Sequence, residues 1–90
     1  MRKHFSLRIS GLVQGVWFRA STKQNADTLC ITGLVRNEPD GSVYVEAEGE
    51  EEDLLSFAAW CQHGPASARV DKCDIREGSL KGFREFTIER

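Results

Sequence analysis

The chain has 90 residues, a formal net charge of −2 and a hydrophobic content of 40%, which together predict one globular domain, residues 1–90, built on a single core. Charged residues make up 29% of the sequence, an ordinary share for a globular protein that argues against disorder. The acidic balance excludes a general nucleic-acid binder, which carries an excess of lysine and arginine. An anion site in this protein is therefore expected to be a local arrangement.

The chain shows neither a secretory nor a membrane-spanning pattern. Residues 1–5 are basic, but polar residues interrupt the apolar ones that follow, so no signal peptide is predicted. The apolar runs are far shorter than the roughly 20 residues that span a membrane. The spacing of Cys30, Cys61 and Cys73 fits neither a disulfide framework nor a zinc site. We therefore expect a cytoplasmic protein whose cysteines stay reduced and pack as small core residues.

In chain order, the first elements are a strand, a helix and a hairpin. Apolar and polar residues alternate over 5–10, which predicts a half-buried strand. Less polar positions recur at helical spacing over 17–29 and predict a helix. Pro39-Asp40-Gly41 lies between β-like runs at 32–38 and 42–49, which predicts two antiparallel neighbouring strands.

A second helix and two further strands are expected in the remainder of the chain. The acidic run 50–53 precedes apolar positions at helical spacing, and we interpret it as a solvated helix start because adjacent carboxylates on a helix do not converge on a cation. Residues 70–76 and 83–89 predict strands. The order βαββαβ with an added final strand predicts an α+β sandwich in which two helices pack on one face of an antiparallel sheet. One face of the sheet is expected to be covered, and Tyr44, Glu46 and Glu48 share the other face.

The segment from Gly11 to Arg19 has the features of an anion-binding loop. It runs from a strand through two glycines into a helix, where inward-turned and unpaired N–H groups attract an anion. Arg19 places a positive charge in the first turn of the helix, where the helix dipole disfavours it unless an anion is bound. The fork of N–H donors on its guanidinium matches the oxygens of a phosphate. Taken alone, Arg19 is equally well explained by a surface ion pair. The segment matches neither the Walker A pattern, which needs Gly-Lys followed by Ser or Thr, nor the complete Gly-x-Gly-x-x-Gly pattern. No nucleotide is therefore predicted.

The string Gly-Leu-Val-Gln-Gly-Val-Trp-Phe-Arg at residues 11–19 resembles the signature of the acylphosphatase family. Residues 33–37, 40–43, 64–70 and 83–88 also resemble it, so the similarity extends over nearly the whole chain. The resemblance implies a ferredoxin-like fold and hydrolysis of the carboxyl–phosphate bond of small acyl phosphates, without metal or cofactor. It implies a phosphate-binding loop that comprises Val13, Gln14, Gly15, Val16, Trp17, Phe18 and Arg19.

The resemblance also implies that Arg19 binds the phosphoryl group and that Asn37 orients the attacking water. A carboxylate leaving group is a weak base, so positioning and charge stabilisation suffice. Asn37 offers both a donor and an acceptor, although alone it is more often a turn former. His4 and His63 are isolated and are expected to be structural or solvated. We expect a monomer that binds neither nucleic acid nor membrane.

The sequence departs from the family pattern at a few positions. Cys30 stands where the family commonly has glycine after the first helix, and a left-handed conformation there costs about 1 kcal/mol. Leu34 replaces a common aromatic residue, and Trp17 fills a variable place. Both are expected to influence which acyl group packs at the mouth of the site.

Two other functions are open at this point. One is a non-catalytic anion-binding ferredoxin-like module, because similar domains occur inside larger carbamoyl-transferring enzymes. Against it, the chain runs from Met1 to just past its last expected strand and is expected to act alone. The other is an RNA-recognition module, because modules of that family share the βαββαβ order. Lys81-Gly82-Phe83 matches only a short part of their Lys/Arg-Gly-Phe/Tyr pattern.

Overall fold

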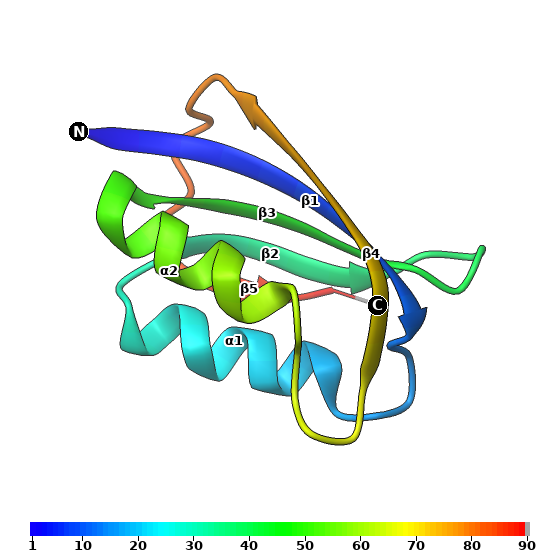
Figure 1. Ribbon diagram of the computed structural model, residues 1–90. Coiled ribbons are helices and arrows are strands. Elements are labelled where there is room, and N and C mark those ends of the chain that lie inside the picture. The colour runs from blue at the N-terminus through cyan, green and yellow to red at the C-terminus, as the bar shows by residue number, and fades with distance from the viewer. Residues whose placement is uncertain (90) are drawn as a thin grey trace.

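The computed structural model describes residues 1–89 and contains the predicted βαββαβ order with an added strand (Figure 1). The elements are β1 (Arg2–Leu12), α1 (Phe18–Thr28), β2 (Thr32–Asn37), β3 (Val43–Glu50), α2 (Glu51–Cys61), β4 (Arg69–Gly78) and β5 (Phe86–Ile88). The ferredoxin-like α+β fold is confirmed.

The five strands form one mixed sheet in the order β4-β1-β3-β2-β5. β1 pairs antiparallel with β3 and β4, and the β2–β3 hairpin is antiparallel as predicted. β5 instead pairs with β2 in parallel, so the expectation of a wholly antiparallel sheet is wrong for the last strand. The reason is the path of the chain, which leaves one edge at β4 and crosses to the opposite edge before β5 begins (Figure 1). Phe83 lies in this crossing, so β5 is shorter than the predicted strand at 83–89.

Both helices lie on the same side of the sheet (Figure 1), with α1 against β2 and β5 and α2 against β1 and β3. The alternation seen in the sequence sends one set of side chains from each strand into the layer between sheet and helices. The central strands contribute the buried residues Phe5, Leu7, Ile9, Val43, Val45 and Ala47. Neither α1 nor α2 is long and apolar enough to cross a membrane.

The face of the sheet opposite the helices is also partly covered, whereas the sequence predicted one covered face. The side chains of Glu46 and Glu48 are buried beneath the crossing segment, residues 79–85. The Glu48 carboxylate accepts hydrogen bonds from the backbone N–H groups of Lys81, Gly82 and Phe83 and contacts His4 Nδ1 at 2.8 Å. Burial raises the pKa of Glu48, but these hydrogen bonds outweigh burial and hold its pKa below the usual value. Glu48 therefore joins the crossing segment to the sheet.

The three cysteines occupy different environments. Cys61 is buried in the core and Cys73 is half-buried; burial raises the pKa of both thiols, that of Cys73 to about 11. Neither is therefore a thiolate at neutral pH. Cys30 is exposed, so the expectation of a core position is wrong for this cysteine. Its φ of 57° confirms the left-handed conformation expected at the end of the first helix.

Candidate active site

The segment between β1 and α1 forms a concave turn of the main chain. Gly15 has a φ of 72° and Trp17 a φ of 64°, and α1 begins directly afterwards at Phe18. Left-handed residues beside right-handed ones turn neighbouring N–H groups toward one side, which is the geometry of an anion nest. Within the described chain, none of the backbone N–H groups of residues 14–19 donates to another residue. These donors are therefore free to bind a ligand.

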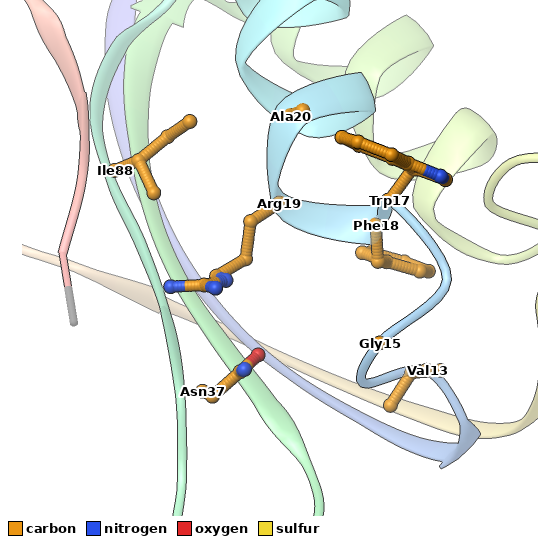
Figure 2. Close-up of a pocket in the computed structure, with 8 residues that line it drawn as sticks. All are labelled: Val13, Gly15, Trp17, Phe18, Arg19, Ala20, Asn37 and Ile88. Atoms are coloured by element: carbon orange, nitrogen blue, oxygen red, sulfur yellow. The ribbon is translucent and has the colours of Figure 1, made fainter.

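A cavity of about 380 Å³ lies against this turn (Figure 2). It brings Arg19, from the first turn of α1, together with Asn37, the last residue of β2. Figure 2 shows both polar side chains pointing into the same space. Among residues 1–89 the lining consists of Val13, Gly15, Trp17, Phe18, Arg19, Ala20, Asn37 and Ile88.

Arg19 is half-buried and is held by the carboxyl-terminal part of the chain. Its Nη1 donates to the carbonyl oxygen of Glu89 at 3.0 Å, and no carboxylate of residues 1–89 forms an ion pair with it. The surface ion pair considered from the sequence is therefore not found in this part of the chain. One hydrogen bond fixes the guanidinium and leaves its other donors for a ligand, since arginine has five N–H groups.

Asn37 presents a buried acceptor that has no partner. Its Oδ1 is inaccessible to solvent and accepts no hydrogen bond from the residues that the structure describes. Leaving such a group unpaired costs about 1–3 kcal/mol, so a native protein retains it for a reason. Asn37 is not the turn former, because Asp40 Oδ1 accepts the hydrogen bonds from Ser42 N and Oγ that close the hairpin.

Gln14 and Val16 belong to the predicted loop but do not line the cavity. Gln14 Nε2 donates to the carbonyl oxygens of Glu38 and Ser42, at 2.8 and 2.9 Å, and so ties the loop to the β2–β3 hairpin. Val16 packs against the core, and its carbonyl oxygen accepts a hydrogen bond from Ser67 Oγ at 2.8 Å. Both residues shape the loop from outside the cavity.

Sequence reasoning missed three parts of the site. Ala20 and Ile88 line the cavity, and the Glu89 carbonyl orients Arg19. Helical register could have suggested Ala20, and Ile88 lies in a stretch that matches the family, but no sequence signal marks a carbonyl. Leu34 is buried on the opposite face of the sheet, paired across from Glu46. Leu34 therefore does not line the cavity, and the expected influence of Leu34 on which acyl group packs at the mouth of the site stays a prediction.

Other sequence features lie outside the cavity. The segment Lys81–Phe83 is in the crossing rather than on a central strand, so it does not form the platform of an RNA-recognition module. His4 is buried against Glu48, and His63 is exposed and absent from the cavity lining. Neither histidine is part of the site, as expected.

Comparison with known proteins gives consistent matches. The acylphosphatase family model matches residues 5–88. An acylphosphatase from Legionella pneumophila (strain Corby) is 53% identical over 90 residues, which cover 98% of this chain and 99% of the relative. One from Methylococcus capsulatus is 46% identical over 89 residues, 98% of this chain and 97% of the relative. The crystal structure of acylphosphatase from Bacillus subtilis superposes with a TM-score of 0.95 at 34% identity and full coverage of both chains.

Proposed function

This chain belongs to the acylphosphatase family and has the function of an acylphosphatase; on that premise we propose how its residues carry out the reaction. Water attacks the phosphorus of an acyl phosphate, the carboxyl–phosphate bond breaks, and the electron pair leaves with the carboxylate. One observation carries this proposal: free loop N–H groups, the Arg19 guanidinium and the unpaired Asn37 Oδ1 border one cavity.

The phosphoryl group is bound by Arg19 and by the backbone of the loop. Phosphoryl transfer spreads negative charge over three equatorial oxygens, and fixed donors aimed at that charge stabilise the transition state. The N–H groups of residues 14–19 and the free guanidinium donors of Arg19 are such donors. Since the Glu89 carbonyl already fixes the guanidinium, little reorganisation is needed when the phosphoryl group arrives.

Asn37 orients the water. Its Oδ1 is buried in the structure, so we propose that the amide turns toward the cavity when the substrate binds. Oδ1 then accepts a hydrogen bond from the water while Nδ2 is free to donate to a phosphoryl oxygen. An amide does not take up a proton at neutral pH, so both protons of the water end on the phosphate product. The leaving carboxylate is a weak base and needs no general acid. The proposed reaction therefore uses no metal or cofactor.

We also propose that the chain is a single domain that acts as a monomer in the cytoplasm. Arg19 and Asn37 of the same chain border one cavity, so both proposed functional side chains can act within one copy. The free cysteines, Cys30, Cys61 and Cys73, suit a reducing compartment.

The roles of Arg19 and Asn37 are tested by the hydrolysis of benzoyl phosphate in the presence of a chelator. We expect Arg19→Gln and Asn37→Ala each to lower kcat/KM by about 100-fold or more, the cost of losing one preorganised group. Asn37→Ala is expected to lower kcat with little change in inhibition by inorganic phosphate, whereas Arg19→Gln also weakens that inhibition. The matched controls are Arg69→Gln and Asn25→Ala, which lie outside the cavity.

The same assay distinguishes the alternatives. A folded wild-type protein that binds inorganic phosphate without turnover would favour the non-catalytic anion-binding module. Loss of activity with chelator would contradict the metal-free reaction. Variants at Arg19 or Asn37 that retain wild-type turnover would contradict the assigned roles.

A further inference from the structure

We propose that Trp17 determines the acyl-group specificity of this enzyme. Together with Ile88, its indole forms an apolar subsite that favours acyl phosphates with an aromatic acyl group over those with a small or additionally charged one. The inference rests on the proposed function, because it assigns the part of the cavity that the phosphoryl group does not use.

The Trp17 side chain is unusually exposed for its size. It is 79% exposed, although tryptophan normally buries most of its surface and dominates contact energies where it does so. Trp60, by comparison, packs against the core at a centroid distance of 5.7 Å from Phe18. Trp17 thus contributes little to the core and offers its apolar surface to whatever enters the cavity that it lines.

The backbone of Trp17 is strained as well. The residue has φ 64° and ψ 19° at the N-cap of α1 and makes no side-chain cap. Glycine fits a left-handed conformation without strain, and asparagine or serine would cap the helix. A tryptophan that satisfies neither need is a departure from local preference, and such departures concentrate at functional sites.

The rest of the lining explains what the indole is for. Arg19 and Asn37 are the polar side chains of the cavity, and the phosphoryl group and the water engage both. Val13, Gly15 and Phe18 belong to the loop and the start of α1, and the other walls are Trp17, Ala20 and the 43% exposed Ile88. Figure 2 shows Trp17 and Ile88 on opposite sides of Arg19. An acyl group that extends from a phosphoryl group bound at Arg19 therefore meets apolar surface on both sides.

The size and charge of the cavity favour the same class of substrate. A volume of about 380 Å³ lies in the range of pockets that enclose a whole small molecule, roughly 300–1,000 Å³. Within residues 1–89, Arg19 is the only charged residue in the lining. Among these residues a second anionic group on the acyl chain would therefore find no further cation, whereas a phenyl ring can stack on the indole.

The test compares benzoyl phosphate with acetyl phosphate as substrates of the wild type, Trp17→Gly, Trp17→Phe and Leu80→Gly. We expect Trp17→Gly to lower kcat/KM for benzoyl phosphate about tenfold more than kcat/KM for acetyl phosphate, so the benzoyl-to-acetyl ratio falls about tenfold. Glycine keeps the left-handed backbone, so the loop and its N–H groups stay in place. Trp17→Phe is expected to restore most of the preference. Leu80 is similarly apolar and 52% exposed, but lies outside the cavity, so Leu80→Gly should leave the ratio unchanged.

Each other outcome overturns the inference. Equal losses for both substrates would mean that the indole shapes the loop rather than contacting the acyl group. An unchanged ratio in Trp17→Gly, with both substrates still hydrolysed, would refute the acyl subsite and leave the proposed function intact. Wild-type hydrolysis of neither substrate would refute the proposed function and this inference with it.

Discussion

Two residues other than glycine, Trp17 and Cys30, adopt a left-handed backbone within residues 1–89. They differ in their position relative to the cavity. Trp17 lines the cavity, whereas Cys30 is an exposed residue between α1 and β2. The family resemblance pointed to Cys30, because glycine is common at that place. No local pattern marked Trp17, since its conformation follows from the way the loop enters the helix.

At Cys30 we expect substitution by glycine to stabilise the protein. Cys30→Gly removes a left-handed side chain, which costs about 1 kcal/mol, so the free energy of unfolding in urea should rise by about that amount. The control is Cys30→Ala, which removes the thiol but retains the Cβ and should give no such gain. An equal rise in both variants would attribute the effect to the thiol instead.

At the level of elements, the site depends on how the β1–α1 loop is fixed to the β2–β3 hairpin. Gln14 makes that connection through two carbonyl oxygens, one of them on Glu38, the residue directly after Asn37. The hydrogen bonds of Gln14 therefore set the position of the Asn37 amide relative to the free N–H groups of the loop.

We expect Gln14→Ala to loosen this connection. Loss of two hydrogen bonds should lower the free energy of unfolding by about 1–3 kcal/mol, and a misplaced Asn37 should lower kcat about 10- to 100-fold. The effect on kcat should exceed that on KM, because the phosphate-binding donors remain. Gln62→Ala, at an exposed residue after α2, is the control. A Gln14→Ala variant with lower stability and wild-type kcat would limit Gln14 to a structural role.

At the scale of the whole molecule, the sequence predicted what local periodicity encodes. Alternation located β1, the hairpin signal located β2 and β3, and helical spacing located both helices. The resemblance assigned roles to Arg19 and Asn37. The path of residues 79–85 could not be predicted, because this segment has no periodicity and is held by Glu48, a residue distant in sequence. The same limit applies to the place of Ile88 in the cavity lining and to the Glu89 carbonyl that holds Arg19, because both depend on β5 lying beside β2.

Glu48 makes the stability of the whole fold sensitive to acid. It connects β3 to the crossing segment and to His4 on β1. The neighbouring Glu46 carboxylate lies 3.3 Å from His4 Nε2 and 2.6 Å from Lys81 Nζ. Because the pKa of Glu48 is below its ordinary value of 4.5 in the folded protein, the unfolded chain binds the proton more readily. The stabilisation is therefore complete above about pH 4.5 and is lost as the pH falls through the lower, folded-state pKa.

We expect Glu48→Gln to lower the free energy of unfolding at pH 7 by about 2–4 kcal/mol. The variant should also lose less stability than the wild type between about pH 5 and about pH 3, because a carboxyl group titrates within about one to two pH units of its pKa. Urea denaturation across this range provides the measurement, and Glu85→Gln, at an exposed position in the crossing, is the control. Parallel pH profiles for wild type and Glu48→Gln would show that other carboxylates cause the acid sensitivity.

The placement of β4 bears on how copies of the protein behave when crowded. β4 pairs with β1 on one side only, so its other side offers main-chain groups to which a neighbouring copy could add a strand. Lysine, arginine, aspartate and glutamate residues follow one another along this strand, and a docked strand would have to accommodate them. Such charged borders discourage fibrous stacking. The opposite border, β5, is only three residues long, so neither rim of the sheet is a good template for fibre growth.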